Sequence, residues 1–128
     1  KGAFLLLSCD YRIGALGSFK IGLNEVAIGM TMHNAGIEIA RNRIPQNFFN
    51  RSVINAEIFD PNTAIEAGFI DLAVEPEALM KTAQFAAEQM GKLNMKAHHA
   101  TKLKTRKEFL NTLDQAIESD LNTVLTFG

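Results

Sequence analysis

Three single residues in this sequence could take part in chemistry, and each also has an ordinary structural role. Glu25 lies in a loop-like segment, where a carboxylate serves as an exposed charge, a helix cap, or, if burial raises its pKa, a general acid or base. His33 could transfer a proton, but a lone histidine before a predicted helix start is more often a cap or surface residue. Cys9 ends an apolar run with no activating base nearby, which favours a buried small hydrophobe.

The other histidines and a group of basic residues lie in the C-terminal third. His98 and His99 are adjacent on a predicted helix, where their side chains point about 100° apart and cannot easily face one ion, so we expect no metal site. Every Lys and Arg of residues 92–128 lies between Lys92 and Lys107. This basic cluster is typical of a solvated helix face, but it also suits attraction of a phosphate-bearing ligand. Because no aromatic residues interleave for base stacking, we expect no nucleic acid partner.

The composition is that of an ordinary globular domain, with 47% hydrophobic and 21% charged residues and a net charge of −1. The longest apolar run, residues 3–7, is far shorter than the ~20 residues that a membrane span needs, so we expect no membrane partner. The single cysteine cannot form an intrachain disulfide, and we expect a cytoplasmic protein. Because an apolar run directly follows Lys1 and no Met begins the sequence, we expect a fragment of a longer protein.

The turn and cap residues divide the first half of the chain into short elements. Residues 10–13 and 19–21 alternate in polarity and read as strands around a turn, and residues 23–32 read as a loop. Asn34 can cap a helix that runs to about residue 42, and Pro45 begins a second short helix.

The clearest local signal is the segment 60–68. Asp60 can accept the free amides of a first helical turn, Pro61 suits that turn, and Gly68 can adopt the left-handed cap at its end. Residues 69–74 follow as a strand. Pro76 then opens a longer helix with an apolar stripe, formed by Leu79, Ala83, Ala86, Met90 and Leu93. A last helix, from about residue 95 to 125, carries a second stripe, formed by Leu103, Leu110, Leu113, Ile117, Leu121 and Val124.

Three segments together carry a family resemblance. Cys9-Asp10-Tyr11-Arg12 follows an apolar helix, residues 21–29 read Ile-Gly-Leu-Asn-Glu-Val-Ala-Ile-Gly, and residues 59–70 run from Phe-Asp-Pro to Ala-Ile-Glu-Ala-Gly-Phe-Ile. In this order they resemble the "CD-x-R", "F-x-x-P-E-x-x-x-G" and "I-x-A-x-E-A-x-x-x-G-L-V" segments of the crotonase (enoyl-CoA hydratase/isomerase) family. The resemblance covers essentially the whole chain, which is about half the usual length for the family.

The resemblance implies an α/β fold, the crotonase-like ββα spiral. Residues 1–75 would form the C-terminal part of its core, and residues 76–128 a helical region used in oligomerisation. Members of the family are typically trimers or paired trimers, so a homo-oligomer is expected. The stripe of the last helix would then be either an interface between subunits or a face buried against its own domain.

The resemblance also implies the site. In the family, acyl-CoA thioesters react through enolate-like intermediates, and two backbone amides stabilise the charge on the thioester oxygen. One of those amides would align with Lys1 or Gly2, and the other would lie outside this chain. Hydratases of the family use two glutamates: the first falls here at Phe4, which has no proton to move, and the second at Glu25.

A single glutamate suffices for an isomerase, which takes a proton from one carbon and returns it to another. The family's Pro-Gly pair that helps to position the catalytic water is Met32-His33 here, which also disfavours hydration. We therefore expect an acyl-CoA enzyme of isomerase type, inactive as this fragment alone, with coenzyme A as part of the substrate and no cofactor. By alignment Phe4, Met30, Met32 and His33 would contact substrate. The alternatives are thioester hydrolysis, decarboxylation or racemisation, or a non-catalytic assembly module.

Overall fold

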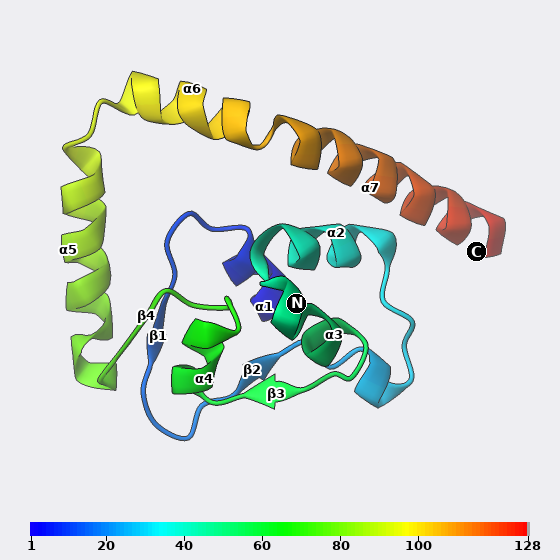
Figure 1. Ribbon diagram of the computed structural model, residues 1–128, viewed down its shortest axis with the longest axis horizontal. Coiled ribbons are helices and arrows are strands. Elements are labelled where there is room, and N and C mark those ends of the chain that lie inside the picture. The colour runs from blue at the N-terminus through cyan, green and yellow to red at the C-terminus, as the bar shows by residue number, and fades with distance from the viewer. Residues whose placement is uncertain (128) are drawn as a thin grey trace.

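The computed structural model describes the backbone of residues 1–127 and the side chains of residues 1–123. A compact body surrounds a short central helix, and three further helices follow one another around its edge and over its top (Figure 1). The helices are α1 (Gly2–Leu7), α2 (Asn34–Arg43), α3 (Gln46–Val53), α4 (Pro61–Glu66), α5 (Leu79–Gly91), α6 (Met95–Thr105) and α7 (Lys107–Phe127), with two 3₁₀ turns, η1 (Val26–Ile28) and η2 (Pro76–Ala78).

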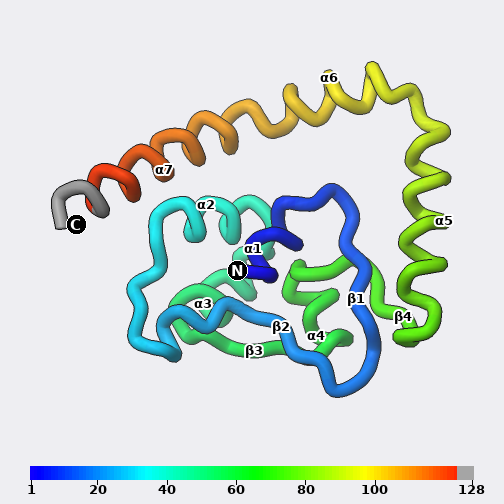
Figure 2. The backbone as a smooth tube through the Cα atoms, turned by 180° about the vertical axis from the view of Figure 1, so that it is seen from behind, coloured from blue at the N-terminus to red at the C-terminus, as the bar shows by residue number. Residues whose placement is uncertain are grey.

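The strands form two separate pairs. β1 (Ile13–Ala15) lies parallel to β4 (Leu72–Val74), and β2 (Ile21–Gly22) lies antiparallel to β3 (Ile58–Phe59). Figure 2 shows the β2–β3 pair on the side of the body away from α6 and α7, and the β1–β4 pair at the edge next to α5. A two-stranded pair is marginal by itself, so these strands depend on the helices packed against them. The predicted strands exist but begin later than expected, and β3 was not predicted.

The caps of α4 are as the sequence predicts. The Thr63 amide donates to Asp60 Oδ1 at 2.8 Å, and this hydrogen bond to the backbone holds the pKa of Asp60 below its usual value. Gly68 has a φ of 86°, and it also lies against the junction between α2 and α3. A Cβ at Gly68 would be 2.7 Å from Pro45 Cδ and 2.9 Å from the Arg43 carbonyl oxygen, so no other residue fits there without displacement.

The core is built from residues of nearly every element in the body. Phe59 is its centre, with the Phe48 ring at 5.7 Å and the Phe69 ring at 5.9 Å between centroids. Leu7 of α1 and Leu23 before η1 are almost fully buried in the same cluster. Ser52 is also completely buried, and its hydroxyl has no hydrogen-bond partner among the described residues.

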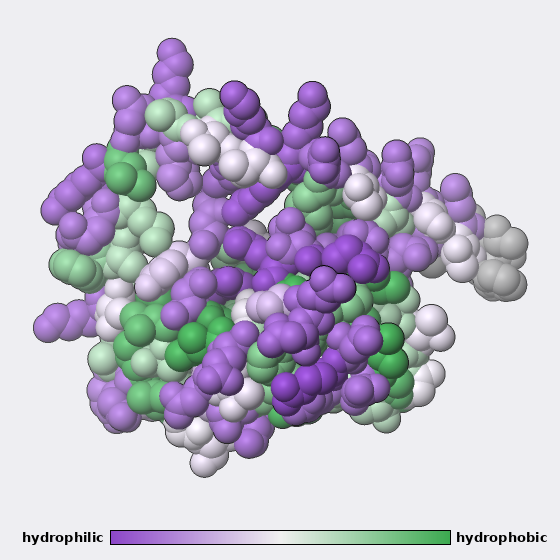
Figure 3. Space-filling view, in the orientation of Figure 1, coloured by the Kyte–Doolittle hydropathy of each residue, from purple (hydrophilic) through white to green (hydrophobic). Residues whose placement is uncertain are grey.

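The C-terminal region differs from the single last helix that the sequence predicts. Arg106, with φ −103° and ψ 8°, ends α6, and α7 begins at the next residue. α5 packs on β1 and α7 packs on α2, while α6 passes above an opening between them (Figure 3). The helix break divides the predicted stripe: Leu113 is half-buried, whereas four other members are exposed, namely Leu103, Leu110, Ile117 and Leu121. Leu93, predicted on the inner stripe of the preceding helix, is exposed as well. The side chain of Val124 lies outside the described residues.

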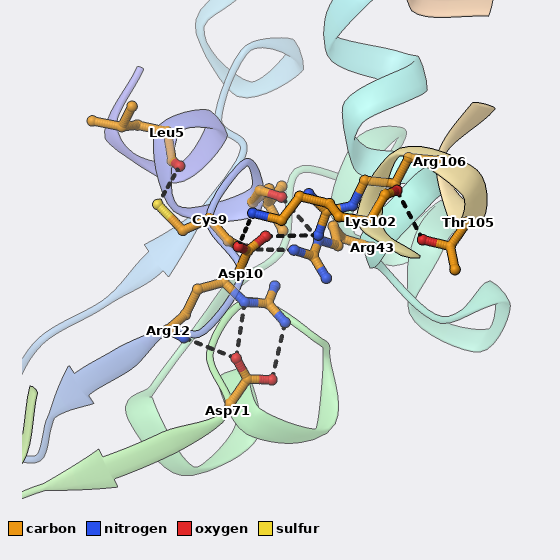
Figure 4. A network of polar contacts seen from close by, with 10 residues as sticks. Leu5, Cys9, Asp10, Arg12, Arg43, Asp71, Lys102, Thr105 and Arg106 are labelled. Atoms are coloured by element: carbon orange, nitrogen blue, oxygen red, sulfur yellow. Dashed lines mark hydrogen bonds and ion pairs between the residues drawn. The ribbon is translucent and has the colours of Figure 1, made fainter. Parts of the chain in front are cut away.

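Arg12 is the one charged side chain of the described residues that the core buries, with 6% of it exposed. Its guanidinium donates to both carboxylate oxygens of Asp71, each at 3.1 Å, and to the Gly68 carbonyl oxygen at 2.6 Å (Figure 4). The Arg12 amide donates to Asp71 Oδ2 at 2.9 Å, and the Asp71 amide donates back to the Arg12 carbonyl oxygen at 2.8 Å. This set of bonds joins the start of β1 to the start of β4.

Asp71→Asn is expected to lower the free energy of unfolding by about 2 kcal/mol, because it leaves the buried guanidinium without its countercharge. The estimate lies below the range for fully buried pairs because 34% of the Asp71 side chain is exposed. Urea denaturation followed by circular dichroism measures the change. Glu38→Gln, which removes a surface pair with Arg41 at 3.6 Å, is the control and should change stability by less than ~0.5 kcal/mol. Equal effects of the two substitutions would contradict the assigned role of Asp71.

Ser52→Ala is expected to raise the free energy of unfolding by about 1 kcal/mol, because a buried hydroxyl without a partner loses its hydrogen bonds to water on folding. The same urea titration checks it, with an unchanged m-value. Ser18→Ala, at an exposed turn position, should have no measurable effect. Destabilisation by Ser52→Ala would mean that the hydroxyl has a partner after all.

Candidate active site

Glu25 is the N-cap of η1 and lies two residues after the buried Leu23. Its carbonyl oxygen accepts from the Met30 amide at 2.8 Å and from the Ile28 amide at 3.2 Å, so the backbone at this position is fixed by the turn. The side chain is half-buried, and the carboxylate oxygen Oε2 is buried without any hydrogen-bond donor among the described residues. A buried carboxylate oxygen with no partner costs folding free energy, so stability does not account for it.

The residues around Glu25 form an apolar surface on η1 and the segment that follows. Val26, Ile28 and Met30 are 46%, 62% and 53% exposed. Gly29, between them, has a φ of 81° and nothing within 4 Å of where a Cβ would lie. The unpartnered carboxylate is therefore next in sequence to side chains that a hydrophobic ligand could cover.

Met32 is placed differently from Met30, although the sequence predicts that both contact substrate. Met32 is 8% exposed and belongs to the core cluster. Its sulfur lies close to the start of α2, where a Cβ at Gly36 would come within 2.9 Å of it. Of the two methionines, Met30 alone presents most of its surface to solvent.

His33 is the N-cap of α2, in place of the predicted Asn34. Its Nδ1 accepts from the Gly36 amide at 2.7 Å, so in this arrangement Nδ1 carries no proton. The Phe4 ring lies 5.3 Å from the His33 ring, between centroids, at 43°. The structure thus brings together two of the residues predicted to contact substrate, one from α1 and one from the start of α2. The role of His33 as a cap, which the sequence favours over proton transfer, is confirmed.

Lys1 and Gly2 stand at the exposed start of α1. The first amides of a helix have no acceptor within it, so they can donate to a ligand or to solvent. A Cβ at Gly2 would meet nothing within 4 Å, so internal packing does not require glycine there. These observations leave room for an approaching oxygen atom.

Cys9 is exposed, and its thiol donates to the Leu5 carbonyl oxygen at 3.3 Å. The prediction of a buried cysteine is wrong because α1 ends just before it, and the chain turns outward there instead of continuing into the core. Within residues 1–127 no helix is both long and apolar enough to cross a membrane. Side chains of His, Cys, Asp and Glu do not gather in threes suited to a metal ion in the described part of the chain.

Asp120 of α7 binds the first amides of α2, a contact that no local pattern in the sequence indicates. Its Oδ1 accepts from the Asn34 amide at 2.9 Å and from Asn34 Nδ2 at 3.0 Å, and its Oδ2 accepts from the Ala35 amide at 2.8 Å. Slight burial raises the pKa of Asp120, but the hydrogen bonds from Ala35 and Asn34 outweigh it and leave the pKa below its usual value. The last helix thereby fixes the start of α2, next to the His33–Phe4 pair.

Comparison with known proteins gives one consistent result. The family model described as enoyl-CoA hydratase/isomerase matches residues 1–127. A crystal structure of an enoyl-CoA hydratase/isomerase family protein from Pseudomonas syringae is 63% identical, with a TM-score of 0.91 over 93% of this chain and 52% of that one.

Two curated relatives carry different activities in their names. The human mitochondrial enoyl-CoA delta isomerase 1 is 28% identical over 98% of this chain and 42% of its own length. The short-chain-enoyl-CoA hydratase of Clostridium acetobutylicum is 26% identical over 98% of this chain and 45% of its own length. The chain therefore spans less than half the length of these relatives.

Asp120→Ala is expected to lower the free energy of unfolding by about 1 kcal/mol near neutral pH, the usual effect of losing an N-terminal cap. Because the pKa of Asp120 is lower in the folded protein, this stabilisation is complete above the unfolded value of about 3.9 and is lost as pH falls further, through the folded value. Denaturation of both proteins between pH 7 and pH 2.5 measures the difference. Asp114→Ala, on the same helix and exposed, is the control. A difference that persists unchanged at the lowest pH would contradict the electrostatic origin.

Proposed function

The chain belongs to the enoyl-CoA hydratase/isomerase family, and on that premise we propose that it is part of an enzyme that moves a double bond within an acyl-CoA thioester. The expected α/β crotonase-like fold is confirmed by structural neighbours such as the Pseudomonas syringae protein. Glu25 is the proposed acid/base, and the observation that carries this assignment is the buried, unpartnered Oε2. No donor among the described residues holds this oxygen, and the Glu25 side chain is only half-buried, so the carboxylate is free to take a proton from a bound substrate.

The proposed reaction needs one carboxylate and one anion site. Glu25 takes a proton from the carbon next to the thioester carbonyl, and negative charge grows on the thioester oxygen. Backbone amides at Lys1 and Gly2 contribute to the stabilisation of that oxygen. The protonated Glu25 then gives its proton to the γ carbon, at the far end of the original double bond, and the double bond comes to lie between the α and β carbons. The apolar side chains after Glu25, Met30 among them, cover the acyl group.

Isomerisation is preferred to hydration because of Phe4. Hydration requires a second group to activate water, and the position that resembles the family's first glutamate holds a phenyl ring packed against the core and against His33. The names of the relatives include both an isomerase and a hydratase and do not separate the two activities. Phe4 and His33 are proposed to contact the substrate at the edge of its site, and no proton transfer is assigned to either residue.

We further propose that the protein assembles as a homo-oligomer and works in the cytoplasm. The support for assembly is the set of exposed apolar residues on α7, namely Leu110, Ile117 and Leu121, which the body of the chain does not cover. A mass measurement in solution tests it, and a strict monomer at micromolar concentration would count against it. The human relative is named as mitochondrial, which is a different compartment from the proposed cytoplasm. Fractionation of cells that express the protein tests the cytoplasmic proposal.

Glu25→Gln is expected to reduce enoyl-CoA isomerisation by about 100- to 10,000-fold, because the amide cannot carry the proton. The rate is measured in a chimera that joins this chain to the remaining part of the Pseudomonas syringae protein, and this chain alone is expected to be inactive. Glu38→Gln in the same chimera is the matched control and should retain full activity. Circular dichroism confirms that each variant is folded. An active chimera in which Glu25→Gln leaves isomerisation and hydration unchanged would refute the assignment.

A further inference from the structure

A second candidate site lies under α6, where the helix passes above the body of the chain. The hollow has a volume of about 520 Å³. Its polar wall comes mainly from α6 and the residue that ends it: His98, Thr101, Lys102, Thr105 and Arg106, with Asp10 facing them. The segment between β2 and α2, which holds the proposed acid/base, lies on the opposite side of the body in both ribbon views (Figures 1 and 2).

The polar network that adjoins this hollow contains more positive than negative charge (Figure 4). Asp71 is fully engaged by Arg12, as described above. Asp10 accepts from Lys102 and, at 2.8 Å, from Arg106, so one carboxylate serves two cations. These contacts, together with burial, set the pKa of Asp10: the bond from Lys102 is the largest effect, and the pKa is lowered overall.

Arg43 adds a further cation beside this network without a carboxylate bound to it. Its Nε donates to the Leu7 carbonyl oxygen at 3.1 Å, and its other bond goes to the carbonyl oxygen of Cys9. Burial lowers the pKa of Arg43, and the positive charges of Arg12 and Arg106 lower it further, against the opposite effect of the two aspartates. Of the four cations in this network, Lys102 and Arg106 line the hollow, and they share the single carboxylate of Asp10.

We propose that the hollow under α6 binds an anion of the phosphate class, held by Lys102 and Arg106. A phosphate oxygen accepts charge-assisted hydrogen bonds from a guanidinium and an ammonium group, and both line this cavity. His98 and the Thr101 hydroxyl supply further donors within the same wall. The site goes beyond the proposed function, because none of its residues takes part in the proton transfer assigned to Glu25. The phosphate is either a free ion or part of a larger ligand such as a nucleotide.

The competing explanation is that Lys102 and Arg106 serve only to hold Asp10 and so fix α6 to the body. The two explanations differ in what Asp10→Asn does. If the cations form an anion site, the substitution removes the competing negative charge and tightens anion binding by about tenfold or more. If they serve only to hold α6, the substitution weakens the attachment of the helix and creates no gain in anion affinity.

The test is isothermal titration calorimetry of this chain with pyrophosphate, inorganic phosphate and coenzyme A at low ionic strength. Binding of pyrophosphate that Asp10→Asn tightens and Lys102→Gln weakens by about tenfold is the expected result. Lys104→Gln, which removes an exposed cation of the same helix outside the cavity, is the control and should change the Kd less than twofold. Binding of all three ligands that Lys102→Gln weakens indicates that phosphate itself is recognised. Binding of coenzyme A alone indicates a nucleotide-linked phosphate in the hollow only if Lys102→Gln weakens it, because an acyl-CoA site at Glu25 would not respond to this substitution.

Three outcomes are decisive against the site. The first is the absence of binding heat for pyrophosphate with both the unsubstituted chain and Asp10→Asn. The second is an equal loss of pyrophosphate affinity in Lys104→Gln and Lys102→Gln. The third is an Asp10→Asn variant that is folded but does not bind pyrophosphate more tightly. Circular dichroism verifies folding in each case, and Asp10→Asn supplies the decision if Lys102→Gln fails to fold. Glu25→Gln should bind pyrophosphate with unchanged affinity, so loss of the anion site and loss of the proposed catalytic role are measured separately.

Discussion

The buried guanidinium of Arg12 is the constraint on which the rest of the body depends. An arginine cannot shed its charge inside a protein, so its burial requires a partner of fixed geometry. Asp71, which follows α4 in the sequence, provides that partner. Gly68 provides a carbonyl oxygen, and its left-handed backbone turns the chain so that this oxygen faces Arg12. The bonds align β1 with β4, and α5 packs on β1, so this ion pair supports the strand against which the first of the C-terminal helices packs.

Arg12 and Glu25 differ in whether the fold supplies hydrogen-bond partners for their charged groups. Every nitrogen of the Arg12 guanidinium has an acceptor, whereas Glu25 Oε2 is covered and has no donor among the described residues. Buried polar atoms in folded proteins are normally satisfied, and each exception needs an explanation. Ser52 is an exception that costs stability, whereas for Glu25 an unpaired carboxylate is the state that its proposed catalytic role requires.

The sequence was informative where the signals are local. The caps at Asp60 and Gly68 and the helix after His33 follow from residue types within one or two turns, and they were predicted with bounds close to those observed. The partners Asp71 and Asp120 lie 59 and 86 residues from the groups they bind, and no local pattern specifies such pairs. The break at Arg106 was missed for a related reason: the 3.6-residue periodicity continues across it, and the bond to Asp10 that holds Arg106 is long-range. The motif placed Glu25, but only packing determines that one of its oxygens has no donor.

The attachment of α7 to the start of α2 has a mechanical consequence. Sliding α7 by a single helical turn, about 5.4 Å, would separate Asp120 from the amides of Asn34 and Ala35 and leave those donors exposed. The first turn of α2 and the ring of His33 against Phe4 thus move in register with the C-terminal helix. A contact that holds α7 in place therefore also holds the first turn of α2, at whose start His33 packs against Phe4.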